Sequence, residues 1–331
     1  MKPKVSVIIV NYNSMRIRDI VSQSIMSVLK SSYRPLEIVI VDNGSSDGSY
    51  EYIKSLMKVR PKDLKVKLIK LSKNLGFAVA NNLAFKKIDS ESKYIALINN
   101  DLAIEEDSIE KLVNFIENNP DVAGVQGRIL TWDCNKIDSA YNYVTQFYNI
   151  IPIFRGLPIN ACQKTKFVSY VDGAFSIYRV EAVKRSGGLF RPYFFMWGDD
   201  YELGIRLWRK GYKLVYVPIT VGRHYRSATV DKQTKKMHLD YWKTCANSAI
   251  IVMYDRLWIV NFLFRFILSI LYGVIYRNKD YLRGVIDGFR IGIKLRKSIK
   301  DLRSSTVKEP QLRLSIKSLL IILLKSLEGK A

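Results

Sequence analysis

The chain has 331 residues, of which 48% are hydrophobic, so it can bury a large core and is not a disordered polymer. Its 53 Lys and Arg against 30 Asp and Glu give a formal charge of +23, which favours phosphate-bearing partners: nucleotides, nucleic acid or an anionic membrane. Three scattered cysteines without a CxxC pair predict neither a disulfide framework nor a zinc site. The first apolar run, Val5 to Val10, is too short for a signal peptide, and we expect a cytosolic protein.

The beginning of the chain predicts a βαβ unit. Val5 to Val10 is an unbroken β-branched run typical of a strand in a parallel sheet, and a helical stretch leads to a second such strand, LEIVIVD, which ends at Asp42. Ligands of open α/β sheets gather at the carboxyl ends of strands, so residues 11–13 and 42–45 should face one crevice. The Asp42 carboxylate suits a nucleoside there, and an ordinary tight turn explains the same residues equally well.

Two further strands extend this pattern. VKLIKL, ending at Leu71, precedes Asn74 and Gly76, and the loop matches neither a P-loop nor a dinucleotide fingerprint. Tyr94 to Ile98 ends in NNDLAI, which places Asp101 in the same crevice. Oxygen-rich sites with few charges suit Mg²⁺ or Mn²⁺ shared with a diphosphate, so Asp101 is a candidate metal ligand, or else it caps the following helix.

The composition changes after Asp121. The aromatic and Asn-rich residues 132–165 are interpreted as a variable loop region. The next segment, FVSYVDGAFSIYR, has a strand pattern in which Gly173 and Ala174 would let a ligand approach beside Asp172. This segment is a candidate binding surface.

Two adjacent acids, Asp199 and Asp200, follow an aromatic run and begin a helical pattern in which Leu203 and Leu207 lie four apart, with Gly211 as a stop. At a helix N-terminus the dipole and free N–H groups favour the ionised carboxylate, so a general base that is charged at neutral pH is expected. A helix cap is the alternative explanation.

A strand through Val217 follows, and then His224, one of only two histidines. With Asp101 across the crevice His224 could complete a metal or diphosphate site, or it could be structural.

Six segments in this order resemble the inverting family 2 glycosyltransferases with the GT-A fold, most closely the branch with bacterial rhamnosyltransferases and galactofuranosyltransferases. They are VSVIIVNYN, VDNGSSDGS, NLGFAVANN, NNDLAI, VDGAF and FFMWGDDYEL. The matched motifs run from Val5 to about His224, two thirds of the chain, and they are specific together although each is weak alone. The resemblance implies an α/β fold with a Rossmann-like, mostly parallel sheet flanked by helices, here in a catalytic domain of residues 1–230.

The resemblance also implies residue roles. Asp200 would be the catalytic base, Asp199 would orient the acceptor, and Asp101, in the metal role of the DxD motif, would hold Mg²⁺ or Mn²⁺ with His224. Asn99 replaces the first acid of that motif, so the metal would have fewer charged ligands. The nucleotide-sugar would contact Asn11, Tyr12, Asn13, Asp42, Asn74, Gly76, Asn100 and Asp101, and the acceptor Trp197, Gly173 and Ala174.

Residues 231–331 are expected to form a basic, apolar helical extension that associates with a membrane, since they carry 20 basic and 8 acidic residues. Leu257 to Tyr276 has 16 apolar residues among 20, but Arg265 near its centre makes spanning about break-even, and the basic flank beyond it favours an in-plane or re-entrant helix. Leu312 to Leu327 is interpreted as a second interfacial helix. The alternative is a helical pair that packs as core or as a homo-oligomer interface.

The predicted function is therefore the transfer of a sugar from a dTDP- or UDP-linked donor to a glycan or polyprenyl-linked acceptor, at an anionic membrane surface on the cytosolic side. No nucleic-acid partner is expected. A nucleotidyltransferase would need a Gly-rich phosphate loop after the first strand, and NYNSMRIRD has none. A degenerate membrane scaffold or a nucleic-acid binder is disfavoured by the acid pair and the apolar C-terminal region.

Overall fold

The computed structural model describes residues 2–226, 232–275, 278–313 and 315. It divides into two compact units, one of residues 1–142 and 152–230 and the other of residues 143–151 and 231–331. The sequence analysis placed a boundary after residue 230 but assigned residues 143–151 to the catalytic domain, whereas the structure places them in the second unit.

Ten strands of the described residues form one sheet in the first unit, in the order β10-β12-β6-β11-β4-β1-β2-β3, with β5 paired to β12 and β7 to β6. β1 pairs in parallel with β2 and β4, and β2 with β3, whereas β11 is antiparallel to β4 and β6. These strands are β1 Lys4–Asn11, β2 Leu36–Asp42, β3 Lys65–Lys70, β4 Ser92–Ile98, β5 Leu102–Ile104, β6 Val122–Thr131, β7 Ile137–Ser139, β10 Lys166–Phe167, β11 Phe175–Arg179 and β12 Lys213–His224.

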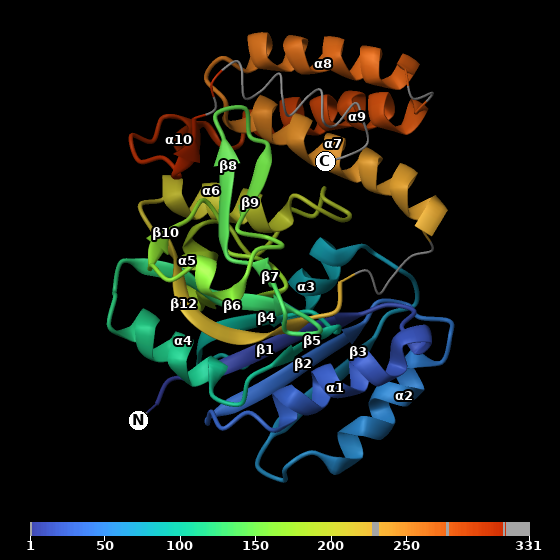
Figure 1. Ribbon diagram of the computed structural model, residues 1–331, viewed down its shortest axis with the longest axis vertical. Helices are drawn as coiled ribbons and strands as arrows, with labels where there is room; N and C mark the ends of the chain where they lie inside the picture. Colours follow the sequence, from blue (N-terminus) through green and yellow to red (C-terminus); the bar gives the residue numbers. More distant parts are fainter. Residues whose placement is uncertain (1, 227–231, 276–277, 314, 316–331) are drawn as a thin grey trace. The chain divides into compact units, whose positions relative to one another are not determined.

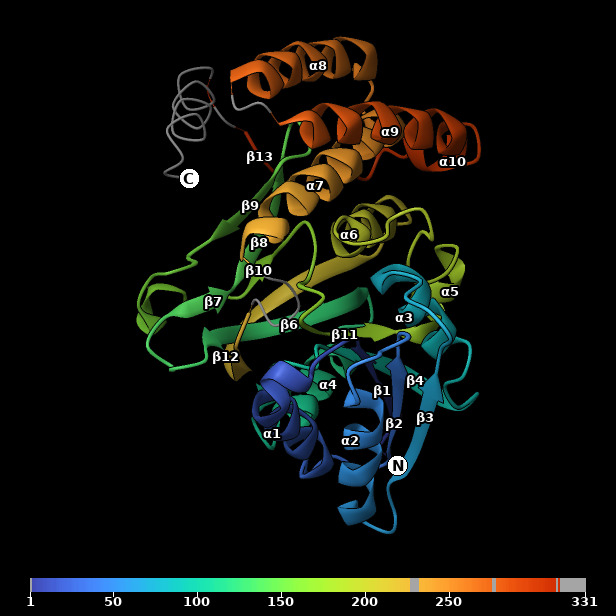
Figure 2. The ribbon, with the colours of Figure 1, turned by 90° about the vertical axis from the view of Figure 1, so that its right-hand side faces the viewer.

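Helices cover both faces of this sheet. In Figures 1 and 2, α1, α2 and α4 lie on one face, and α3, α5 and α6 lie on the other. Their bounds are α1 Arg18–Leu29, α2 Ser49–Leu56, α3 Phe77–Phe85, α4 Ser108–Glu117, α5 Val180–Arg185 and α6 Asp199–Arg209, with short 3₁₀ turns at Met15–Ile17, Met57–Val59 and Ile159–Ala161. Because both faces are covered, β2 is buried along its whole length, which explains the unbroken apolar run from Ile38 to Val41. The α/β fold with a mostly parallel central sheet is as predicted.

Three predictions about individual elements are wrong. Residues 132–165 are not a loop region, since they contain β7, β8 Tyr141–Thr145 and β9 Ile150–Ile153. The predicted strand over residues 167–179 pairs with β4 and β6 only from Phe175, because Asp172 turns the backbone locally: its Oδ1 accepts from Ala174 N at 2.9 Å. β12 does not end at Val217 but continues to His224, its last residue, through pairing with β5 and β6.

The second unit contains α7 Lys232–Tyr254, α8 Trp258–Ile275, α9 Lys279–Arg296, α10 Lys300–Arg303 and the short β13 Gln311–Leu312, which pairs with β8. α9 packs on α7 through glycines four residues apart: a Cβ on Gly288 would lie 2.2 Å from the carbonyl oxygen of Cys245. α8 corresponds to the apolar segment 257–276, and no helix in the described part of the chain has the length and apolar character needed to cross a membrane. Apart from residues 312, 313 and 315, the predicted helix over 312–327 lies outside the described residues.

Candidate active site

The carboxyl ends of β1 and β2 carry Asn11 and Asp42, which are paired in the parallel register and are fully buried. Asn11 Nδ2 donates to Asp42 Oδ1 at 3.0 Å, and Ser45 N donates to Asp42 Oδ2 at 3.0 Å. Asn13 has a φ of 42°, and its backbone N–H donates to Ser45 Oγ at 2.9 Å. The structure thus brings Asn11, Asn13 and Asp42 together with partly buried Tyr12 between them, and the Asp42 carboxylate holds the loop after β2.

A second polar pair joins the loops after β2 and β3. Asn43 Nδ2 donates to Asn74 Oδ1 at 2.9 Å, and Gly76 precedes α3 with a φ of +85°. A Cβ on Gly76 would lie 2.7 Å from the carbonyl oxygen of Phe195, which also accepts from Phe77 N at 2.7 Å. Glycine is required at this position by both φ and space. The loop after β3 therefore touches the segment that leads into Asp199, and Asn43, one of the residues 42–45 expected to face the crevice, joins it to the loop after β2.

Asp101 and His224 are brought together by the pairing of β5 with β12, in which His224 lies opposite Leu102. His224 Nε2 lies 3.0 Å from Asp101 Oδ1, and Nδ1 lies 3.0 Å from Asp138 Oδ2. Burial alone would lower the pKa of His224, but the hydrogen bonds with the two carboxylates raise it to about 9. Both ring nitrogens of His224 therefore lie within hydrogen-bond distance of a carboxylate, an arrangement that favours the protonated ring. The proximity of Asp101 and His224 is as predicted from the sequence, whereas Asp138 was not predicted.

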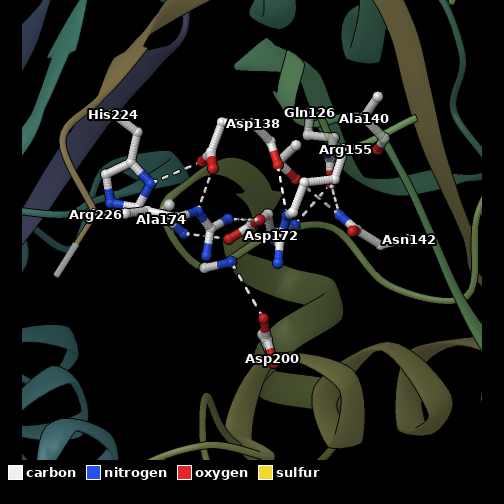
Figure 3. A network of polar contacts seen from close by, with 12 residues as sticks. Gln126, Asp138, Ala140, Asn142, Arg155, Asp172, Ala174, Asp200, His224 and Arg226 are labelled. Atoms are coloured by element: carbon white, nitrogen blue, oxygen red, sulfur yellow. Dashed lines mark hydrogen bonds and ion pairs between the residues drawn. The ribbon is translucent and has the colours of Figure 1, made fainter. Parts of the chain in front are cut away.

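Asp138 also connects this group to Asp172 (Figure 3). Arg226 Nε donates to Asp138 Oδ1, Arg226 Nη2 donates to Asp172 Oδ2 at 3.4 Å, and Arg155 Nε donates to the carbonyl oxygen of Asp138 at 2.9 Å. Burial would raise the pKa of Asp172, but the Arg226 charge and the hydrogen bonds from Ser139 and Ala174 lower it below its ordinary value. Asp172 is therefore ionised.

Asp199 and Asp200 are the first two residues of α6, and the N-cap position belongs to Gly198, with a φ of 92°. Asp200 Oδ1 accepts from Tyr201 N at 2.8 Å, and Oδ2 accepts from Gly173 N at 3.4 Å. Asp199 is buried, with 5% of its surface exposed, whereas Asp200 is partly exposed. Asp200 is therefore the acid of the pair that a second molecule can reach.

The expectation that the helix terminus keeps both acids ionised at neutral pH is wrong. Burial, with further contributions from the charges of Asp172 and Glu202, raises the pKa of Asp199 to about 7. Burial, and then the charges of Asp199 and Asp172, raise the pKa of Asp200 well above its ordinary value, against the smaller effect of the two N–H groups. Desolvation and like-charge repulsion outweigh the helix terminus here. A carboxylate in such surroundings accepts a proton readily.

Hydrogen bonds connect the end of β1 and the loop after β4 to the segment that contacts Asp200. Asn100 Nδ2 donates to Asn11 Oδ1 at 2.8 Å, and Asn99 N donates to the carbonyl oxygen of Ala174 at 2.9 Å. Ala174 follows Gly173, which contacts Asp200. Trp197 lies in the turn before α6 with a φ of 68°, an uncommon backbone conformation for a non-glycine residue.

A divalent cation would find two protein ligands here, Asp101 and the neutral form of His224, so its binding would have to displace the proton on His224 Nε2. Among the described residues no three His, Cys, Asp or Glu side chains are grouped in a way that could hold a metal. Asp101 and His224 nevertheless lie side by side, and Mg²⁺ is commonly bound through one or two carboxylates plus phosphate oxygens and waters. With Asn99 at the place of a further acid, this pair fits a cation that takes its other ligands from a bound diphosphate.

Comparison with known proteins agrees with this architecture. Residues 6–187 match the family described as Glycosyl transferase family 2. A relative from Bacillus subtilis, the putative teichuronic acid biosynthesis glycosyltransferase TuaG, is 33% identical over 115 residues, which are 35% of this chain and 42% of TuaG, so the match spans less than half of that protein.

Two solved structures share the fold. S. aureus TarS 1-349 in complex with UDP-GlcNAc has a TM-score of 0.56 at 13% identity and covers 99% of this chain and 92% of its own. GalNAc-T7 with UDP, GalNAc and Mn²⁺ has a TM-score of 0.59 at 15% identity, over 93% of this chain and 55% of its own. Because the family match covers more than half of the sequence and the fold agrees with it, the chain belongs to glycosyl transferase family 2.

Proposed function

We propose that this protein transfers a sugar from a nucleotide-sugar to a hydroxyl group with inversion at the anomeric carbon. One observation carries the proposal: Asp200 is a partly exposed carboxyl group with a raised pKa. It accepts a hydrogen bond from Gly173 N, and the next residue, Ala174, accepts one from Asn99, which follows β4. A general base needs both properties, since it must reach the substrate proton and must bind it once removed. Membership of family 2 supports the reaction class.

The proposed reaction is a single displacement. Asp200 accepts the proton of the acceptor hydroxyl while the acceptor oxygen forms a bond to the anomeric carbon. The bond between that carbon and the diphosphate oxygen breaks, and the nucleoside diphosphate leaves with the bonding electron pair from the opposite face. Asp199, which is buried beside Asp200, helps to keep the pKa of the base high in addition to its predicted role in orienting the acceptor.

The nucleotide-sugar is proposed to bind along the loops after β1, β2 and β3, where Asn13 and Asn74 are partly exposed. Asn11 and Asp42 would act there by holding the loop after β2, since both side chains are fully buried. Asp101 and His224 would hold Mg²⁺ or Mn²⁺. When bound, this cation neutralises charge on the leaving diphosphate. Mn²⁺ in the GalNAc-T7 structure supports this choice.

A UDP- or dTDP-linked donor is proposed, supported by UDP-GlcNAc in the TarS complex. The acceptor is proposed to be a glycan or a polyprenyl-linked sugar of the cell envelope, because TuaG is named for teichuronic acid biosynthesis. From the resemblance of the sequence motifs, we propose that the transferred sugar is rhamnose or galactofuranose. We propose that the reaction takes place on the cytosolic side of the membrane.

A thermal-shift screen tests donor binding. Sugar nucleotides with different bases are added with and without Mn²⁺, and we expect one base to raise the melting temperature, more strongly with the cation. Asp101→Asn should remove the Mn²⁺-dependent part of that shift, whereas Asp107→Asn, a partly exposed acid at the N-cap of α4, should not. The absence of a shift with every sugar nucleotide, or an equal cation effect in both variants, would contradict the proposed donor site.

A further inference from the structure

α8 is apolar on two opposite faces, and its own unit covers only one of them. Trp258, Phe262, Arg265 and Ser269 recur at helical spacing on the covered face. The Phe262 ring lies 4.7 Å from that of Phe289 in α9, Ser269 is 1% exposed, and Arg265 Nη1 donates to Asn149 Oδ1 at 2.9 Å. The single charge of α8 therefore points toward its own unit, which resolves the difficulty that Arg265 posed in the sequence.

The opposite face of α8 consists of large exposed apolar side chains. Val260, Phe264, Ile267, Leu271 and Ile275 follow one another at spacings of three or four residues and are 63%, 53%, 57%, 53% and 61% exposed. This exposed α8 face runs for about 22 Å at a rise of 1.5 Å per residue. Soluble surfaces rarely expose so long an apolar stripe, and such stripes commonly mark an interaction site.

The surroundings of this face are basic. Among the described residues between 256 and 303, seven Lys or Arg side chains are exposed and one acid, Asp301, is exposed. On α9, which packs against α8, Arg283, Ile286, Arg290 and Ile293 form an exposed stripe at spacings of three or four residues. Arg283 and Arg290 are 74% and 73% exposed and share one acidic neighbour, Asp287. Apolar and cationic side chains thus occur together on adjacent helices.

We propose that the exposed α8 face, with the basic stripe of α9, docks in the plane of an anionic lipid surface. Aliphatic and Phe side chains match the boundary of the acyl chains, and the surrounding Lys and Arg match the lipid phosphates. A second copy of this chain fits less well, because it would bring two surfaces of the same strong positive charge together. This inference concerns the second unit alone and does not depend on the proposed reaction.

The test uses the full-length protein with vesicles of phosphatidylethanolamine and phosphatidylglycerol, compared with vesicles of phosphatidylcholine. We expect flotation with the anionic vesicles, weakened as NaCl rises from about 50 to about 500 mM because salt screens the charges. The triple variant Phe264→Ser, Ile267→Ser, Leu271→Ser should bind these vesicles at least about tenfold more weakly. Val59→Ser, which changes an apolar residue 66% exposed in the first unit, is the matched control and should bind normally. Asp200→Asn should also bind normally, which separates docking from catalysis.

A fluorescent label on the exposed α8 face distinguishes lipid from the two alternative occupants, which are another part of the same chain and a second copy of it. Of the three cysteines only Cys134 is exposed, so Cys134→Ser with Ile267→Cys allows a polarity-sensitive fluorophore to be attached at position 267. A blue shift on adding anionic vesicles supports the proposal. If the label is already shielded from water in the monomer before vesicles are added, another part of the same chain covers this face. If the protein does not float with the vesicles and the triple variant changes its oligomeric state, the exposed α8 face binds a second copy of the chain. This result, or a label that is already shielded, would overturn lipid docking.

Discussion

Asp200 and Asp199 are neighbours in sequence but differ in surroundings, since Asp199 is buried and Asp200 is partly exposed. The base must be ionised to accept a proton, so the transfer rate should rise with pH through the raised pKa of Asp200. Because the Asp199 charge contributes to that raised pKa, Asp199→Asn should move the acidic limb of the rate profile to lower pH. Initial rates between about pH 5 and 9 measure this. The exposed Glu91→Gln is the control, and an unmoved limb in Asp199→Asn would contradict the coupling.

Asp138 holds two cationic side chains, with one carboxylate oxygen on His224 and the other on Arg226. Asp138→Asn should leave His224 in place but less well oriented, and groups that orient a metal ligand contribute about 10- to 100-fold to metal affinity. We expect that loss in Mn²⁺ affinity, measured by calorimetry with a nucleoside diphosphate present. Asp133→Asn, an exposed acid in the turn after β6, should bind Mn²⁺ normally. Equal affinities in both variants would show that Asp138 does not position His224.

The acid pair, Asp101 and His224 could be selected from the sequence because each follows or begins a recognisable element. Asp138 and Arg155 could not, because they lie in a stretch whose polar, aromatic composition suggests an exposed loop. Asp138 is buried, and its burial is compensated by ion pairs with residues far away in sequence, such as Arg226. Hydropathy patterns carry no signal for such partners. The pKa of Asp200 was predicted in the wrong direction for a related reason: its burial, which raises the pKa most, and the proximity of Asp172 both arise from tertiary packing.

At the scale of elements, the central parallel strands were predictable and the added strands were not. β1, β2 and β4 are continuous apolar runs buried between two helical layers, and each is found within one or two residues of its predicted bounds. β7 contains the buried polar residues Asp138 and Ser139, so it lacks the apolar alternation of an ordinary strand. Such a strand is specified by its partners rather than by its own composition.

The contact between α7 and α9 depends on the absence of side chains at Gly284, Gly288 and Gly292. Gly288→Leu should destabilise the second unit by about 1–3 kcal/mol or more, because the added Cβ meets backbone and the helices must separate. Gly273→Ala in α8 is the control: its Cβ would have one neighbour, at 3.5 Å, and alanine favours a helix by about 1 kcal/mol over glycine. Chemical denaturation measures both. If Gly288→Leu is as stable as the parent, the close helix packing is not essential.

At the scale of the whole molecule, the order of motifs predicted the architecture better than any single motif did. Each parallel strand ends in a polar segment, and together these segments form the carboxyl edge of one sheet, where Asn11 contacts Asp42 and Asn100. The dense positive charge after residue 230 predicted a separate region with its own partner. Which face of its helices is exposed could not be predicted, because α8 has large apolar side chains on both faces, and its contacts with Phe289 and Asn149 decide which side is covered.

The central claim is that Asp200 removes the acceptor proton. The direct measurement compares donor binding by calorimetry with transfer by product formation, for the parent protein and Asp200→Asn. We expect the variant to bind the sugar nucleotide within about twofold of the parent while transfer falls about 100- to 10,000-fold, the usual contribution of a general base. Transfer close to that of the parent would contradict the claim. So would a parallel loss of donor binding, since it would make Asp200 a structural residue of the donor site.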